Sequence, residues 1–370
     1  MKYKILIDGI SLFPPITGIG RYTYEVSKNI EKNTDFKVNY FYGYYSKRLI
    51  SNSSNKMNLK KILTKINFIK RIIRKLLIFS TKLYTPSFDL YWQPNFIPHD
   101  GIKSKKIVTT VHDFSFILYK DFHPKGRIEY FEKYFFKSVM QSDLIITGSE
   151  FTKNEIIKYL SYPKDKIKVI YHGINNEIFK VYNNFELSID IPERFIFSVG
   201  SIEPRKNLLG LLKAYNNLSK DIKDEYKLVI AGFKGWENKE IMELINRNKS
   251  YIKYIGFVSD IELAKIYNLA SCFIFPSYYE GFGLPIIEAM SCGTPVICSN
   301  NSSLKEIGKD SVLFCDPFCI DDIKDKLILL LSDKELQFDL SLKGLNRAKS
   351  FSWEKSADEH IKLFNEVLKS

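Results

Sequence analysis

The chain has 370 residues, of which 45% are hydrophobic and 26% charged, the composition of a soluble globular protein. This length suits two α/β domains, each with its own core, and no run of about 18 or more apolar residues predicts a membrane-spanning helix. The net charge is +13, but no nucleic-acid-binding motif accompanies the basic residues, so we expect no nucleic-acid partner.

The N-terminus predicts a buried first strand, Lys4–Ile7, because its apolar run is too short for a secretory signal. Residues 14–22, Pro-Pro-Ile-Thr-Gly-Ile-Gly-Arg-Tyr, follow this strand and lead into a predicted helix, Tyr22–Ile30. Gly18 and Gly20 form a Gly-x-Gly loop before this helix. The loop alone is a weak signal, because the third glycine of a dinucleotide-binding fingerprint is missing.

Residues 56–82 contain nine basic residues and no acidic one. Their apolar residues recur at spacings of three and four, the pattern of one helical face. A basic amphipathic helix can lie on an anionic membrane surface with its apolar face down. The alternative is an ordinary helix that packs this face on the sheet of its domain. We expect membrane contact, and hence a cytoplasmic protein that is peripheral on the inner face of the cell membrane.

Apolar runs alternate with helical patterns along the whole chain, which predicts doubly wound parallel sheets in an α/β fold. In the first half we expect the strands Lys4–Ile7, Val38–Tyr42, Leu90–Trp92, Ile107–Val111, Leu144–Thr147 and Lys168–Ile170. In the second half we expect Phe195–Val199, Lys227–Ala231, Ile252–Tyr254, Cys272–Phe275, Pro295–Cys298 and Val312–Phe314. The polar stretch 176–193 is the expected linker between a domain of residues 1–175 and one of residues 194–351.

Two polar motifs follow predicted strands. His112 and Asp113 end the strand Ile107–Val111, and Gly-Ser-Ile-Glu-Pro-Arg-Lys-Asn (200–207) follows Phe195–Val199. A ligand site is expected at the carboxyl ends of such strands. Within the second motif, Arg205 can bind phosphate oxygens in a bidentate way and Lys206 supplies a point charge. The alternative for this pair is an ordinary exposed basic loop.

The most informative stretch is Tyr-Glu-Gly-Phe-Gly-Leu-Pro-Ile-Ile-Glu-Ala-Met-Ser-Cys-Gly-Thr-Pro-Val-Ile, residues 279–297. Gly281 and Gly283 allow a sharp turn and a close approach of the backbone to a ligand. The helix N-terminus that follows is a cradle for anions. Glu280 and Glu288 would repel a phosphate, so they are better suited to bind hydroxyls. The combination indicates a sugar nucleotide.

Residues 279–297 closely resemble the donor-site signature of the retaining glycosyltransferases of family four, which have the GT-B fold of two Rossmann-like domains facing a cleft. The resemblance implies that Glu280 lies by the hydroxyls of the donor sugar and that Glu288 binds the ribose. The remaining donor-site residues that it implies are Gly281, Phe282, Gly283 and Leu284.

The same resemblance covers nearly the whole chain and gives roles to the other loops. Lys206 matches a family lysine that holds the donor diphosphate. Many members also carry an arginine directly after the glycine, where this chain has Ser201, so Arg205 is the candidate for that charge. The loop of Gly18 and Gly20 is implied to lie against the diphosphate.

His112 is the remaining catalytic candidate. A histidine at a strand end is often structural, but related enzymes that use GDP-mannose have Val-His-Asp here, and its histidine contacts the transferred sugar. Retention of configuration requires stabilisation of oxocarbenium-like charge on one face of the sugar. His112 could supply it through its ring or by orienting a carbonyl group.

The resemblance implies that residues 1–175 bind the acceptor, that residues 194–351 bind the nucleotide sugar, and that the C-terminal helix 352–370 packs back on the first domain. We therefore expect a retaining transferase that moves mannose from GDP-mannose to a glycan or polyprenyl-linked acceptor in the synthesis of O-antigen or capsule. The alternatives are a UDP-hexose or UDP-N-acetylhexosamine donor, an epimerase of the same fold, or a non-catalytic protein that binds a glycan lipid.

We expect neither a metal ion nor another cofactor. The chain has no Asp-x-Asp, the motif with which many GT-A enzymes hold a divalent cation. The five cysteines are Cys272, Cys292, Cys298, Cys315 and Cys319. Their odd number and the lack of CxxC spacing favour reduced, buried thiols in the cytosol.

Overall fold

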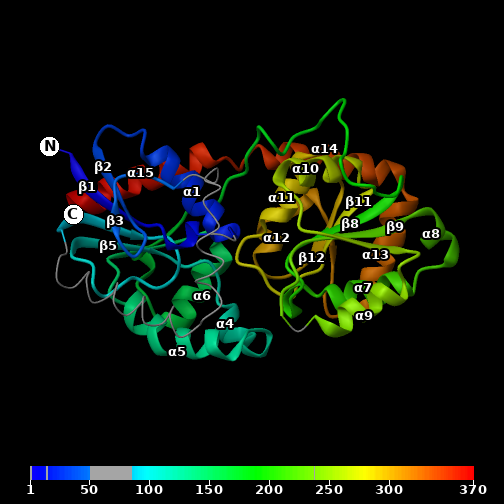
Figure 1. Cartoon of the computed structure of the whole chain (residues 1–370), viewed down its shortest axis with the longest axis horizontal. Coiled ribbons are helices and arrows are strands. Elements are labelled where there is room, and N and C mark those ends of the chain that lie inside the picture. Colours follow the sequence, from blue (N-terminus) through cyan, green and yellow to red (C-terminus); the bar gives the residue numbers. More distant parts are fainter. Residues whose placement is uncertain (1, 14–15, 51–85, 237) are drawn as a thin grey trace, which may run out of the picture.

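The computed structural model describes residues 2–13, 16–50, 86–236 and 238–370. The chain forms two α/β halves that lie side by side, one on the left and one on the right of Figure 1. The basic segment 56–82 lies outside the described residues. Among the helices that are described, none has both the length and the apolar character to cross a membrane.

The first half is built on a seven-stranded sheet with the order β3-β2-β1-β4-β5-β6-β7. Its strands are β1 (Tyr3–Asp8), β2 (Phe36–Phe41), β3 (Tyr45–Ser46), β4 (Phe88–Gln93), β5 (Ser104–Thr110), β6 (Leu144–Thr147) and β7 (Ile167–Val169). All neighbours pair in parallel except β3, which is antiparallel to β2. We did not predict β3, because two residues at a sheet edge carry no periodic signal.

Helices cover both faces of this sheet. The main helices are α1 (Gly18–Ile30), α4 (Ser115–Leu118), α5 (Lys125–Val139), α6 (Glu150–Leu160) and, from the far end of the chain, α15 (Trp353–Lys369). The core under α1 and α15 contains Ile5 and Ile7 of β1, whereas Leu6 packs on the opposite side. This alternation is the two-residue period of a strand.

The second half has a six-stranded parallel sheet with the order β10-β9-β8-β11-β12-β13. The strands are β8 (Phe195–Val199), β9 (Lys227–Ala231), β10 (Ile252–Gly256), β11 (Cys272–Phe275), β12 (Val296–Ser299) and β13 (Leu313–Cys315). The order reverses between β8 and β11, as in a doubly wound nucleotide-binding sheet. All the predicted strands of both halves are present, with ends that differ by up to three residues, so the predicted fold class is confirmed.

Two layers of helices enclose the second sheet. They are α7 (Leu208–Asn216), α8 (Lys220–Glu225), α9 (Lys239–Arg247), α10 (Asp260–Leu269), α11 (Leu284–Ser291), α12 (Ser302–Gly308), α13 (Ile320–Ser332) and α14 (Lys334–Ala348). Helices α10, α11 and α12 share a core with Phe195 and Phe197 of β8. Helices α7, α9 and α13 share the opposite core with Ile196.

The chain crosses between the halves twice, and the two crossings touch. Ile174 and Ser352 form an isolated parallel bridge, and a side chain at Gly173 would collide with the backbone of Trp353. Helix α15 therefore starts beside the first crossing and returns along α1, as Figure 1 shows in red and blue.

A defined hydrogen-bond chain fixes α15 on α1. His360 Nδ1 donates to the Ser356 carbonyl oxygen at 2.7 Å, so Nε2 is the acceptor in the neutral ring. The Tyr22 hydroxyl then donates to Nε2, also at 2.7 Å. Both side chains are buried, and burial lowers the pKa of His360 to about 4, so this histidine stays neutral near pH 7.

Two local expectations were wrong. Helix α1 begins at Gly18, with Thr17 at its N-cap, so both glycines lie in its first turn and not in a loop before Tyr22. The first N–H groups of a helix have no partner within it, and glycine is therefore tolerated there better than in the interior. Cys319 is exposed at the N-cap of α13, whereas the other four cysteines are buried as expected.

Candidate active site

A cavity of about 470 Å³ lies where the carboxyl ends of strands from both halves meet. The loops after β8 and β11 enter it, at the reversal point where such sheets bind ligands. It is lined by ten of the predicted site residues: Gly18, His112, Arg205, Lys206, Glu280, Gly281, Phe282, Gly283, Leu284 and Glu288.

The Glu280 carboxylate is the centre of a buried charge cluster. Its Oε1 accepts from Lys206 Nζ at 2.6 Å, and its Oε2 accepts from Arg205 Nη1 at 2.9 Å. Burial would raise the pKa of Glu280, but the two cations outweigh it and hold that pKa at about 2. Glu280 is therefore an anion at any physiological pH, suited to accept hydrogen bonds from hydroxyl groups.

Arg205 uses most of its N–H donors in hydrogen bonds within the protein. Nη1 also donates to the Tyr279 carbonyl at 2.7 Å, and Nη2 donates to Glu203 Oε1 at 2.9 Å. Burial alone would lower the pKa of Arg205, but the surrounding carboxylates, Glu280 first, raise it further above its ordinary value. Arg205 thus mainly orients Glu280, while Lys206 keeps two further N–H donors for a ligand.

The charged side chains that line the cavity balance one another. Four are cationic and four anionic: Arg21, Arg127, Arg205, Lys206, Asp113, Glu203, Glu280 and Glu288. The lining side chains therefore carry no net positive charge that would attract an anionic ligand. Its recognition must come from directed donors, the Lys206 ammonium group and the free N–H groups at helix N-termini.

Two helix N-termini open into the cavity, one from each half. Gly18 in the first turn of α1 lines it, but Gly20 does not, because Gly20 packs against the Ser11 carbonyl oxygen, 2.6 Å from where a Cβ would lie. Gly283 is the N-cap of α11 with φ of 107°, a conformation that glycine adopts without strain. Leu284 of α11 lies against Gly18.

The loop that carries Glu280 is fixed against the first half. The Ser149 hydroxyl donates to the Gly281 carbonyl oxygen at 2.8 Å. A side chain at Gly281 would collide with the His112 carbonyl oxygen, so only glycine allows this approach. The structure thereby brings His112 and Glu280, which are 168 positions apart in the sequence, to the same cavity.

His112 lines the cavity with a neutral imidazole ring. Its Nε2 donates to the Pro94 carbonyl oxygen at 2.7 Å. Burial lowers the pKa of His112 more than that carbonyl group raises it, so Nδ1 carries a lone pair and no proton. The neighbouring Asp113 accepts from the Ser115 backbone N–H and hydroxyl at the start of α4.

Arg21 is a cavity residue that the sequence analysis missed. Its Nη1 donates to Glu288 Oε1 and its Nη2 to Asp260 Oδ1, both at 2.5 Å. Burial raises the pKa of Glu288 more than Arg21 lowers it. The only available signal was the Gly-Ile-Gly-Arg-Tyr string, because the two carboxylates lie 239 and 267 positions away.

Tyr279, next to Glu280, inserts into the first half. Its hydroxyl accepts from the Phe114 backbone N–H at 2.8 Å and donates to the Glu155 carboxylate. Burial raises the pKa of Glu155 to about 7, although the Tyr279 hydroxyl opposes the shift. The position of Glu280 is therefore coupled to a carboxyl group that titrates near neutral pH.

This raised pKa predicts a pH-dependent stability. The stabilising contribution of protonated Glu155 is fully present below pH 4.5, its ordinary pKa, and is lost as the pH rises through about 7. Glu155→Gln should therefore raise the free energy of unfolding at pH 8 by on the order of 2 kcal/mol and by less at pH 5. Urea unfolding at both values measures this, with the exposed Glu129→Gln as control. An equal effect at pH 5 and pH 8 would contradict the assignment.

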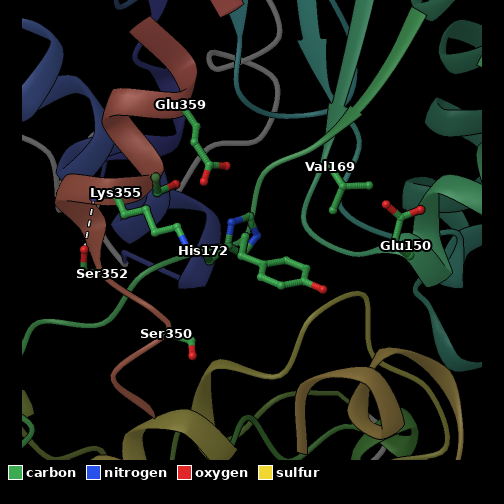
Figure 2. Close-up of a pocket in the computed structure, with 9 residues that line it drawn as sticks. Glu150, Val169, His172, Ser350, Ser352, Lys355 and Glu359 are labelled. Carbon is green, nitrogen blue, oxygen red and sulfur yellow. Dashed lines mark hydrogen bonds between the residues drawn. The ribbon is translucent and has the colours of Figure 1, made fainter. Parts of the chain in front are cut away.

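A second cavity, of about 250 Å³, lies at the two chain crossings (Figure 2). His172 lines both cavities. The centre of its ring lies 4.6 Å from the ring centres of Phe282 and Tyr22. Burial holds the pKa of His172 well below its ordinary value. Within the described part of the chain, its Nδ1 and the Ser356 hydroxyl have no hydrogen-bond partner. His172 is thus the wall between the two cavities.

Comparisons with known proteins agree with this architecture. Residues 16–178 match the family "Glycosyltransferase Family 4", and residues 182–347 match "Glycosyl transferases group 1". The "O-antigen chain mannosyltransferase B" of Escherichia coli is 34% identical, over 98% of this chain and 99% of that protein.

Solved structures share the fold over the whole chain. Sucrose-phosphate synthase from Thermosynechococcus elongatus superposes with a TM-score of 0.73 at 17% identity, covering 100% of both chains. HepE of Anabaena, solved in complex with UDP and glucose, has a TM-score of 0.68 at 14% identity, covering 98% of this chain and 100% of that one. With these matches, the chain belongs to glycosyltransferase family 4 and is a hexosyltransferase of GT-B fold.

Proposed function

We propose that this enzyme transfers mannose from GDP-mannose, with retention of configuration, to a glycan or polyprenyl-linked acceptor in the synthesis of a surface polysaccharide such as O-antigen. The observation that carries the proposal is the Glu280 carboxylate, held by Lys206 and Arg205 at the reversal point of the second sheet. The name of the Escherichia coli relative supports mannose and O-antigen. The UDP and glucose bound by HepE support a nucleotide-sugar donor.

The donor contacts are assigned from the free hydrogen-bonding capacity of each group. A carboxylate has about four acceptor positions, and the cations use one on each oxygen of Glu280. The others accept hydroxyls of the transferred sugar. Lys206 and the N-termini of α1 and α11 donate to the diphosphate.

The ribose is assigned to Glu288 on the same grounds. Its Oε1 accepts from Arg21, and its Oε2 accepts from the Tyr267 hydroxyl at 3.3 Å. One position on each oxygen remains for the two ribose hydroxyls. Glu288 therefore binds the nucleotide, and Glu280 binds the sugar.

In the proposed reaction the bond from the sugar C1 to the phosphate oxygen breaks, and the acceptor oxygen bonds C1 on the same face. The departing phosphate takes the acceptor proton, so no protein base is required. Positive charge develops on the sugar, and fixed dipoles stabilise it best. The dipole of neutral His112 and the negative charge of Glu280 supply this stabilisation. The absence of Asp-x-Asp in the sequence leads us to expect no metal ion.

A donor panel tests the proposal. Release of nucleotide from GDP-mannose, UDP-glucose and UDP-N-acetylglucosamine is measured with an acceptor extract, in EDTA and with Mg²⁺ or Mn²⁺. We expect GDP-mannose to react at least about tenfold faster than the others, a discrimination of about 1.4 kcal/mol, with no loss in EDTA. Turnover that needs the added metal contradicts the metal-independent mechanism, and preference for a UDP donor contradicts the assignment of the donor.

The second candidate is a UDP-hexose or UDP-N-acetylhexosamine transferase, which the UDP bound by HepE favours. The same panel separates the remaining alternatives when each nucleotide sugar is also analysed after incubation without acceptor. An epimerase changes the nucleotide sugar without any acceptor, and a non-catalytic glycan-lipid-binding protein releases no nucleotide from any donor.

We also propose that the protein acts in the cytoplasm, on the inner face of the membrane, through residues 56–82. Several Lys and Arg residues near an anionic surface contribute about 1 kcal/mol each, so attachment should be salt-sensitive. Changing Lys60, Lys61, Arg71, Arg74 and Lys75 to Glu should abolish sedimentation with anionic vesicles. No sedimentation of the unchanged protein at low salt would refute the proposal.

A further inference from the structure

Arg21 joins the two halves of the molecule beside Glu288, at the edge of the cavity. It lies in the first turn of α1, whereas Asp260 begins α10 and Glu288 lies within α11. The guanidinium group donates to both carboxylates through different nitrogens. The guanidinium carbon, Cζ, also lies 5.9 Å from the ring centre of Phe179, which belongs to the segment that links the halves.

The burial of this cluster distinguishes it from an ordinary surface ion pair. The side chains of Glu288 and Arg21 are 7% and 28% exposed, while that of Asp260 is 40% exposed. Burial would lower the pKa of Arg21, but Glu288 and Asp260 together outweigh it. A planar guanidinium group can serve two carboxylates in fixed directions, which a lysine cannot do.

Other contacts between the halves hold different parts of the cavity. The Tyr279 hydroxyl and the Gly281 carbonyl fix the Glu280 loop. The Glu306 carboxylate accepts the N–H groups of Glu150 and Phe151 at the start of α6. Of these cross-half contacts, the one that Arg21 makes holds Glu288, so it sets the position of α10 and α11 relative to α1.

We propose that Arg21 is a positioning residue that holds the two halves in the arrangement needed for transfer, and that the donor does not depend on it for affinity. The proposal rests on the proposed function in one respect, the assignment of side-chain contacts with the donor to Lys206, Glu280 and Glu288. All three belong to the second half, whereas His112 belongs to the first. Loss of Arg21 should therefore separate His112 and the N-terminus of α1 from the bound donor, while the donor contacts of Lys206, Glu280 and Glu288 remain.

The kinetic test uses Arg21→Met, Asp260→Asn and the double variant. We expect kcat to fall about tenfold in Arg21→Met, since small misplacements of reacting groups are costly. The dissociation constant of GDP, measured by calorimetry, should change little, because Glu288 regains an acceptor position and this gain offsets a weaker contact from the N-terminus of α1. Asp260→Asn should have a smaller effect, and the double variant should match Arg21→Met. Weaker GDP binding with unchanged kcat would make Arg21 a simple donor ligand.

A distance measurement tests the arrangement independently of the reaction. Cys319 is exposed and the first half has no cysteine, so one spin label can be placed there and a second on α5 after Glu129→Cys. Arg21→Met should broaden and lengthen the distance distribution. Lys253→Met, which removes the surface pair with Asp190, should not change it. An unchanged distribution in Arg21→Met overturns the proposal, whereas failure of the proposed function would show as inactivity with every donor.

Discussion

Replacing Glu280 with glutamine is expected to lower kcat by on the order of 10³-fold, the largest effect of any single change. Glutamine has the size of glutamate but lacks the charge that Lys206 and Arg205 orient. Its amide group would also present a donor where the sugar hydroxyls need an acceptor. Steady-state kinetics with a saturating donor measures the loss.

Two controls separate chemistry from folding in this variant. Glu280→Ala leaves Lys206 without its carboxylate and Arg205 with one of its two carboxylates, and it should lower the free energy of unfolding by about 3 kcal/mol, whereas Glu280→Gln should cost less. Glu203→Gln removes the other carboxylate that contacts Arg205, and its loss of kcat should be much smaller. If folded Glu280→Gln turned over at the wild-type rate, Glu280 would have no part in the reaction.

Lys206→Met should reduce kcat/KM by about 10²-fold, the loss of one charge-assisted contact in a site screened from water. Methionine retains the apolar stem of the side chain and removes the ammonium group, whose Nζ lies 5.0 Å from the ring centre of Phe275. The packing should therefore survive, and the change removes the donor to both Glu280 and the diphosphate. Binding of GDP by calorimetry, together with kcat/KM, measures the effect.

The matched control is Lys206→Arg, which keeps the charge but not the compact ammonium group. We expect an intermediate loss, because the larger guanidinium group must fit between Glu280 and Phe275. Equal kinetics for wild type and a folded Lys206→Met would remove this loop from the donor site and leave the diphosphate to the helix N-termini.

The alternation of apolar runs and helical patterns predicted the architecture, because each core strand of this fold is nearly continuous in hydrophobic residues. The same logic predicted a ligand site at the carboxyl ends of strands, and in the structure the loops of Lys206 and Glu280 follow neighbouring strands at the reversal point of one sheet. The resemblance to a glycosyltransferase family added the expected roles of these residues. Those roles stay predictions until the variants are measured.

The contacts between distant segments could not be predicted from the sequence. Arg21 pairs with Asp260 and Glu288, and Tyr279 reaches Glu155, because the two sheets meet in one particular arrangement. No local pattern encodes that arrangement. The start of α1 was missed for a different reason: the low helix propensity of Gly18 and Gly20 masks a first turn in which Gly18 and Ile19 line the cavity.

The most direct test of the account is the configuration of the product. The enzyme is incubated with GDP-mannose labelled with ¹³C at C1 and with the acceptor that supports turnover, and the new linkage is followed by NMR. The account predicts that the labelled carbon keeps the anomeric configuration it has in the donor, with GDP as the released nucleotide. An inverted linkage, or a changed nucleotide sugar with no linkage formed, would contradict it.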